Sequence, residues 1–238
     1  MCIRDRIGVN ERSSISGLHV GKNNEIYLTC LESPEEGVSW WKIRNFNNDG
    51  IETPGLVQIY AQINDCYIDQ YGQIFLAGFS WHPLVNDESG LHTQDAGPGR
   101  LSACLFLAKY NANGEVGWFQ TWQASRWEYQ TRLALDGVSN IYITGGFSGE
   151  IDFDPGPGEE IRTANTINGG YMGLTSQANS FVSKFDSDGN FIWVRTGSNN
   201  GNGSAIVVDD NTMDVFTAGI LRGWSPNNGG AFVVKIGQ

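Results

Sequence analysis

Two kinds of segment recur along the chain, and the spacing between them constrains the fold more than any other feature. One is an alternating apolar segment that holds a lysine: "VSWWKI", "LFLAKY", "FVSKF" and "AFVVKI". The other opens with Ile or Val and an aromatic residue: "IYLTC", "IFLAG", "IYITGG" and "VFTAG". The distance from a lysine to the next Ile or Val is 32 residues (Lys42 to Ile74), 32 residues (Lys109 to Ile141) and 31 residues (Lys184 to Val215). A block of nearly constant length therefore repeats.

Two further segments complete each repeat. A turn such as "NNDG", "NANG" or "DSDGN" follows the lysine segment and leads into a strand that carries Trp118 in one copy and Trp193 in another. A short apolar strand ending at or near Asp comes next, as in "CYID", "LALD" and "AIVVD". Alternating residues predict strands, and Gly, Asn and Asp predict turns. Each repeat therefore predicts a four-stranded antiparallel meander, with strands A (apolar, Asp), B (Ile and aromatic), C (lysine) and D (tryptophan).

Sheets that are apolar on both faces are not stable alone in water, and stacking them around an axis gives a β-propeller. The sequence predicts an all-β chain, a β-propeller fragment of about four four-stranded antiparallel blades. We expect blades at about 17–61, 66–124, 132–196 and 204–238, the last without strand D. Residues 7–16 are expected to be the tail of a preceding blade, and "MCIRDR" (1–6) looks like a translated sequencing adaptor. Missing blades of a longer chain are then expected partners.

The segments "AIVVD", "VFTAG" and "FVSKFDSDGNFIWVRTG" together resemble the bacterial seven-bladed β-propeller repeat family, most strongly over residues 132–238. The stretch "GFSGEIDFDPGPG" (146–158) is similar to a loop that recurs in secreted, cell-surface members of that family. The resemblance implies a propeller fold and an extracellular or cell-surface location. The resemblance gives little information about activity.

Composition and charge exclude several kinds of partner. The chain has 31 Gly, 8 Trp and only 17% charged residues, which is typical of short strands joined by tight turns. Its 26 acidic and 15 basic residues give a net charge of −11, so we expect neither nucleic acid binding nor attraction to anionic membranes. No stretch approaches the roughly 18 apolar residues of a spanning helix. With Cys2 set aside, three cysteines remain, namely Cys30, Cys66 and Cys104. They lack CxxC spacing, and buried thiols are favoured over one disulfide bridge with one unpaired cysteine.

The positions of the acidic residues predict turns in preference to metal sites. "DSDGN" supplies Asp186 and Asp188, but Gly197 stands where a calcium loop needs a carboxylate, so we interpret it as a C–D hairpin turn. "IDFDPGPGEE" gathers four acidic residues: Asp152, Asp154, Glu159 and Glu160. A proline-stiffened loop is the favoured interpretation, with Ca²⁺ as the ion that such oxygens would hold. No other cofactor is expected. The repeated lysines and the Asp residues that end strand A (Asp69, Asp136, Asp209) are interpreted as structural.

In a meander the A–B and C–D turns lie at one end, and the B–C and D–A connections lie at the other. The second end receives both long inserts (80–103 and 147–179) and a set of aromatic residues, namely Trp81, Trp127, Tyr129, Tyr171 and Trp224. Loops on a rigid scaffold commonly carry binding, and flat aromatic faces suit sugars and peptides. We therefore expect a non-catalytic scaffold that binds a glycan or protein through this end, with Trp81, Trp127, Tyr129 and Trp224 as contacts.

Two alternatives stay open. One is a polysaccharide-cleaving enzyme, a lyase or hydrolase, that uses Asp152, Asp154 or His82 in a cleft. The other is a set of spacer repeats without a ligand. The chain has no nucleophile elbow, HExxH motif or phosphate loop, so a catalytic role is the weaker hypothesis. Among the other histidines, His19 is expected to pack or to line a channel, and His92 shares a loop with His82.

Overall fold

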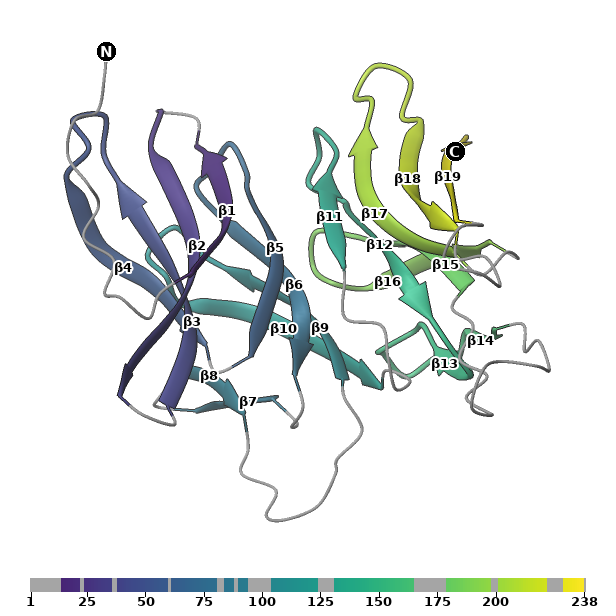
Figure 1. The fold of residues 1–238 in the computed structure, drawn as a ribbon, viewed down its shortest axis with the longest axis horizontal. Helices are drawn as coiled ribbons and strands as arrows, with labels where there is room; N and C mark the ends of the chain where they lie inside the picture. The colour runs from purple at the N-terminus through teal and green to yellow at the C-terminus, as the bar shows by residue number, and fades with distance from the viewer. Residues whose placement is uncertain are drawn as a thin grey trace.

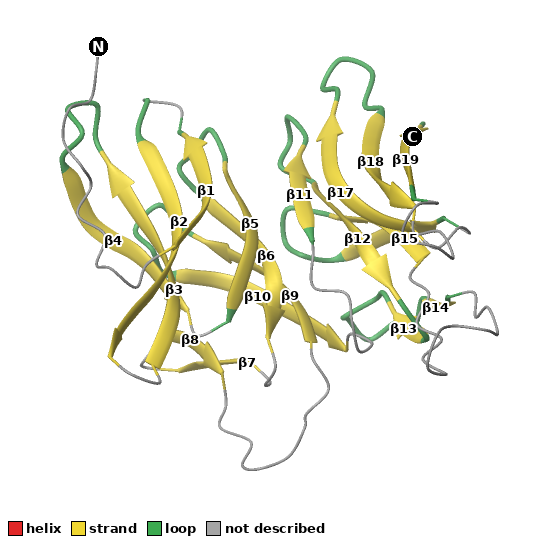
Figure 2. Cartoon of the chain, viewed as in Figure 1, coloured by secondary structure: helices red, strands yellow, loops and turns green. Residues whose placement is uncertain are grey.

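A computed structural model describes residues 14–21, 24–35, 38–59, 61–80, 84–87, 90–93, 104–123, 131–164, 179–197, 201–221 and 229–237. All regular secondary structure in these ranges is β-strand, and Figure 2 shows strands joined by loops. The expectation of an all-β chain is confirmed. No helix of these residues has the length and apolar character needed to cross a lipid bilayer.

Four main sheets follow one another along the chain (Figure 1). Sheet 1 consists of β1 (Ser14–Val20), β2 (Ile26–Glu35), β3 (Val38–Phe46) and β4 (Glu52–Ile59). Sheet 2 consists of β5 (Gln62–Ile68), β6 (Ile74–Ser80), β9 (Cys104–Tyr110) and β10 (Val116–Gln123). Sheet 3 consists of β11 (Arg132–Leu135), β12 (Ile141–Phe147), β15 (Asn179–Phe185) and β16 (Phe191–Thr196). Sheet 4 consists of β17 (Gly201–Val208), β18 (Val215–Leu221) and β19 (Gly230–Ile236).

Each main sheet is an antiparallel meander in which the strands lie in chain order. The order A, B, C, D predicted for a repeat is the order observed in sheets 1 to 3, and sheet 4 has three strands in the described residues. Two small hairpins are inserted between the second and third strands, in sheets 2 and 3. They are β7 (Leu84–Asp87) with β8 (Gly90–Thr93), and β13 (Glu150–Asp152) with β14 (Ile161–Thr163). Both hairpins lie within the long B–C inserts expected at 80–103 and 147–179, for which the sequence predicted no strands.

Side chains at the first turn position fix the C–D turns. Asp186 Oδ1 accepts hydrogen bonds at 2.9 Å from the backbone N–H groups of Asp188 and Asn190, and Gly189 has a φ of +82°. Asn47 and Asn111 accept the equivalent pair of hydrogen bonds in sheets 1 and 2. The interpretation of "DSDGN" as a hairpin turn is therefore confirmed. The residues that end strand A do the same for the A–B turns: Asp69, Asp136 and Asp209.

Three of the repeated lysines lie opposite an aromatic residue of the neighbouring strand. The ammonium nitrogens of Lys109, Lys184 and Lys235 lie 5.4, 4.9 and 5.8 Å from the ring centres of Phe75, Tyr142 and Phe216. Each ammonium group therefore lies over an aromatic ring of its own sheet, as in a cation–π contact, which is consistent with a structural role. Lys235 also pairs with Asp214 at 2.7 Å, and Lys109 donates to the Ser187 carbonyl oxygen of sheet 3 at 3.2 Å.

The equivalence of Lys42 to these three lysines is wrong. The residue opposite the aromatic Tyr27 in sheet 1 is Asn45, two positions before the turn residue Asn47, whereas Lys42 lies opposite Cys30. Adjacent side chains alternate between the faces of a strand, so Lys42 points to the opposite face of its sheet from the other lysines. It forms an ion pair with Glu32 at 3.4 Å.

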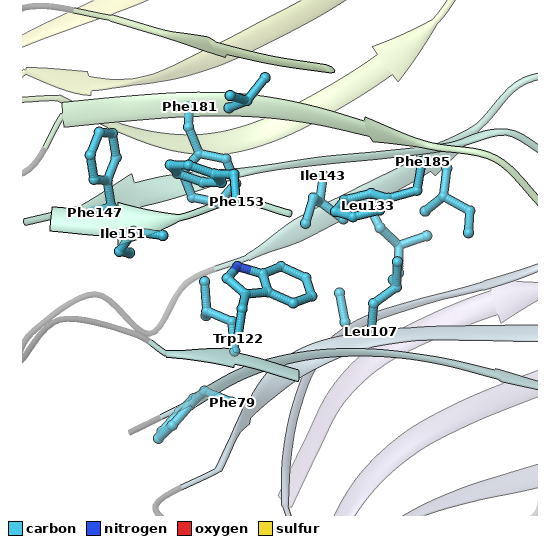
Figure 3. Packing of buried hydrophobic residues seen from close by; sticks show 14 of the residues in the cluster. Phe79, Leu107, Trp122, Leu133, Ile143, Phe147, Ile151, Phe153, Phe181 and Phe185 are labelled. Atoms are coloured by element: carbon cyan, nitrogen blue, oxygen red, sulfur yellow. The ribbon is translucent and has the colours of Figure 1, made fainter. Parts of the chain in front are cut away.

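The sheets pack in succession, and each contact uses the same two faces. We call forward the face that carries Ile43 in sheet 1, Leu107 in sheet 2, Val182 in sheet 3 and Val233 in sheet 4, because these residues share one register position. The opposite, rear face carries Leu18, Cys66, Leu133 and Ile206, which share another. Ile43 packs in one core cluster with Cys66, Leu107 with Leu133, and Val182 with Ile206. Figure 3 shows the second of these clusters, between sheets 2 and 3.

The glycine that ends the "IFLAG" and "VFTAG" segments has a steric cause. Strands β5 and β17 each contain a bulge, at Asn64 and at Ser204, next to the paired strand B. A Cβ added at Gly78 would lie 2.0 Å from the Gln62 carbonyl oxygen, and one at Gly219 would lie 2.0 Å from the Asn202 carbonyl oxygen. The bulged strand thus approaches strand B too closely for any side chain.

Candidate functional site

The two ends of the sheets differ in what they carry. Tight A–B and C–D turns gather at one end, and both B–C hairpins, β7–β8 and β13–β14, extend from the other (Figure 1). This follows from the meander, because successive connections alternate between the ends of an antiparallel sheet. We call the second the hairpin end. It is the end on which the sequence analysis placed the candidate binding residues.

The aromatic candidates lie outside the described residues. These are Trp81, Trp127, Tyr129 and Trp224, together with Tyr171, and His82 lies outside them as well. His92 belongs to β8, where its backbone pairs with Val85. The roles assigned to these residues remain predictions.

The four acidic candidates belong to the β13–β14 hairpin, where most of their contacts shape the turn. Asp152 Oδ1 accepts hydrogen bonds from the backbone N–H groups of Asp154, at 3.0 Å, and Glu160, at 2.8 Å. Asp154 Oδ1 accepts one from Gly156 N at 2.8 Å. The Glu160 carboxylate pairs with the Arg162 guanidinium. Asp152 therefore closes the loop, as Asx turns do.

No group of three or more His, Cys, Asp or Glu side chains is arranged to hold a metal ion in the part of the chain that the structure describes. A calcium site needs six to eight oxygen ligands around one point. One of the two Asp152 carboxylate oxygens, Oδ1, already accepts two backbone hydrogen bonds. The acidic hairpin is thus held by its own backbone contacts.

Both hairpins are anchored in the core. Leu84 and Leu91 of β7 and β8 are buried in the cluster between sheets 1 and 2. Ile151, Phe153 and Ala164 of the second hairpin are buried in the cluster between sheets 2 and 3. The ring of Phe153 lies edge to face with Phe147, with ring centres 5.2 Å apart, and both appear in Figure 3. Such contacts bury one side of each hairpin in the core between two sheets.

A polar seam joins the A strands of sheets 2 and 3. Asn64 Nδ2 donates to Thr131 Oγ1 at 3.2 Å, and Arg132 Nη1 donates to the Asn64 carbonyl oxygen at 3.3 Å. The Asp65 carboxylate accepts from the backbone N–H of Leu133 at 3.0 Å. None of these residues was among the candidates predicted from the sequence. The signal that could have indicated them is a pair of polar residues inside an otherwise apolar strand A.

Burial dominates the electrostatics of this seam. It raises the pKa of the Asp65 carboxyl, against the opposing effect of the Leu133 N–H and of the charges of His19 and Arg132. It also lowers the pKa of His19, although the nearby Asp65 favours the charged form. His19 is half-buried on β1, so part of the expectation for it, that it packs, is observed.

The three cysteines in the described residues are free thiols. Cys30 and Cys66 are buried, and Cys104 is half-buried. Burial raises the pKa of Cys66 to about 12, and the thiol lies 3.5 Å from Thr29 Oγ1 of sheet 1. A thiol with so high a pKa is a poor nucleophile at neutral pH. The expected buried thiols are observed at Cys30 and Cys66.

A comparison of the chain with models of known protein families, and a search of curated proteins, found no match.

Proposed function

We propose that this chain is part of a β-propeller, and that it serves as a non-catalytic scaffold that binds an extracellular glycan or protein through the hairpin end. The succession of sheets supports the propeller. Three consecutive contacts join a forward face to a rear face, and the same register positions meet each time. When the same contact joins each sheet to the next, every pair of neighbouring sheets is related by the same rotation, and the sheets are arranged around a common axis.

One observation carries the binding proposal: each long B–C connection contains, in its described residues, a hairpin whose apolar residues enter the core at the same end of the sheets. A binding surface benefits from supports that do not move, since ordering loops at binding costs free energy. The opposite end consists of short turns whose polar side chains are used to shape the backbone. The net charge of −11 favours a neutral or basic ligand.

A binding screen on neutral glycans and cell-surface proteins tests this proposal. The triple variant Trp81→Ala, Trp127→Ala and Trp224→Ala is expected to lose binding of the ligand that the wild type selects by about 100-fold or more, because aromatic contacts dominate such sites. The matched control is Tyr71→Ala, which removes an aromatic side chain that is 70% exposed in an A–B turn at the opposite end.

Unchanged affinity in the triple variant, or loss in the Tyr71→Ala control, would contradict the placement of the site. A wild type that binds no member of either library would support spacer repeats instead.

A further inference from the structure

The rear face of sheet 1 exposes apolar residues whose counterparts are buried elsewhere in the chain. Leu18 is 65% exposed, whereas Cys66 and Leu133, at the same register position in sheets 2 and 3, are 2% and 5% exposed. Val20 and Ile15 on the same face of β1 are 64% and 53% exposed. No described part of the chain covers this apolar strip.

The forward face of sheet 4 is uncovered in the same way. Val233 is 76% exposed, whereas its counterparts Ile43, Leu107 and Val182 are 0%, 0% and 2% exposed. Val207 and Ile220 lie on this face too, at 58% and 46% exposure. At its two ends the stack of sheets therefore exposes two apolar surfaces: the β1 strip on the rear face of sheet 1, beside the buried Leu28 and Cys30 of β2, and the forward face of sheet 4. These surfaces belong to the two faces that pair with each other three times inside the stack.

We infer that copies of this chain bind head to tail, with the rear face of sheet 1 in one copy covering the forward face of sheet 4 in another. The contact would place Val233 against Leu18, as Ile43 meets Cys66, Leu107 meets Leu133 and Val182 meets Ile206 within the chain. Apolar area of this kind on both partners is driven out of water on contact. A head-to-tail contact is heterologous, so it closes into a ring or continues into an open array.

The polar half of the rear face of sheet 1 favours a second copy over an ordinary four-stranded sheet as the occupant. At the register position of Lys42, sheets 2 and 3 carry Phe106 and Phe181, each 1% exposed. Phe106 is covered by the cluster that includes Val57 and Ile59 of β4, the fourth strand of the preceding sheet. A fourth strand over sheet 1 would bury the Lys42 charge, which is costly.

Sheet 4 has no fourth strand in the described residues, and β19 is its outermost strand. A copy that presents sheet 4 to sheet 1 would cover β1 and leave Lys42 in water, beside Glu32. Arg44, whose side chain on the same face is 12% exposed, would keep its ion pair with Glu52. The apolar strip on β1 thus fits a sheet with three strands, such as sheet 4, better than a sheet with four.

Sedimentation velocity and light scattering of the full chain over a range of concentrations test the inference. We expect the wild type to exceed the monomer mass, and Leu18→Asp or Val233→Asp to weaken self-association by about 100-fold or more, since each places a carboxylate in the contact. Both side chains are exposed in the single chain, so the variants are expected to fold. The matched control is Val138→Asp, which changes a 71% exposed side chain in the β11–β12 turn and leaves association intact.

Mixing the two variants gives the sharpest result. Leu18→Asp chains keep an intact forward face, and Val233→Asp chains keep an intact rear face, so the mixture is expected to form a one-to-one complex although each variant alone is a monomer. A monomeric wild type, association that survives both single variants, or a mixture that stays monomeric would overturn the inference. The assay contains no ligand, so its failure is distinguishable from failure of the proposed binding function.

Discussion

The Asp65 carboxylate of sheet 2 accepts a hydrogen bond at 3.0 Å from the backbone N–H of Leu133 in sheet 3. It ties together the A strands of two repeats at the point where the bulge of β5 turns its polar residues toward the next sheet. The adjacent Asn64 contacts Thr131 and Arg132 of that sheet as well. The apolar contact between sheets 2 and 3 therefore has a directional hydrogen-bonded component, which restricts how the sheets can slide.

Asp65→Asn is expected to leave the free energy of unfolding at neutral pH equal to or above that of the wild type. Burial raises the pKa of the Asp65 carboxyl, against the Leu133 N–H, His19 and Arg132. A group with a raised folded-state pKa stabilises the fold while protonated, and this contribution is lost as pH rises through the folded pKa. Asparagine keeps one oxygen acceptor, for the Leu133 N–H, without the charge. The stability advantage of Asp65→Asn over the wild type should thus be present at pH 7 and vanish below pH 3.8, the ordinary pKa of Asp. Denaturant titrations of both proteins at pH 7 and at pH 3 measure this difference.

Asp65→Ala serves as the control, because it removes the acceptor as well as the charge. It should lower the free energy of unfolding by about 1 to 2 kcal/mol, since a backbone N–H is left without its partner. If Asp65→Asn proved less stable than the wild type at pH 7 but not at pH 3, attraction to His19 and Arg132 would outweigh burial.

Gly78→Ala is expected to destabilise the fold by about 3 kcal/mol, because the new methyl group would meet a backbone carbonyl that no side-chain rotation can move. The Gln62 oxygen lies 2.0 Å from the position of that Cβ. Thermal unfolding measures the effect. Gly137→Ala is the matched control, since the three atoms nearest to its Cβ would all belong to the Asp210 side chain, at 3.7 to 4.0 Å. We expect the control to change stability by no more than about 0.5 kcal/mol. Equal effects at the two glycines would refute the steric explanation of the repeated motif.

The sequence was sufficient for those parts of the fold that local chemistry determines. Alternation of apolar residues indicated the strands, and turn formers such as Asp186 and Gly189 indicated where they reverse. Spacing counted from the lysine gives the wrong register for Lys42. Measured from the turn that begins at Asn47, the same sequence aligns Asn45 with the other lysines.

The seam and the small hairpins depend on contacts that sequence patterns do not encode. Asp65 and Leu133 are separated by 68 residues, and nothing in either segment identifies the other. Strands β13 and β14 have three residues each, which is too short to show alternation. Their formation depends on Asp152, which closes the loop, and on Phe153, which enters the core. A cluster of acidic residues in sequence therefore became a turn in the structure.

The β13–β14 hairpin is expected to be stable without calcium. Asp152→Ala should lower the free energy of unfolding by about 1 kcal/mol, because the N–H groups of Asp154 and Glu160 lose their shared acceptor. Asp152→Asn keeps an acceptor oxygen and should have a smaller effect. Thermal unfolding in EDTA and in excess CaCl₂ should give the same Tm for the wild type and for both variants. A rise in the wild-type Tm with calcium that Asp152→Asn abolishes would instead identify this carboxylate as a metal ligand, because binding to the folded state alone raises Tm.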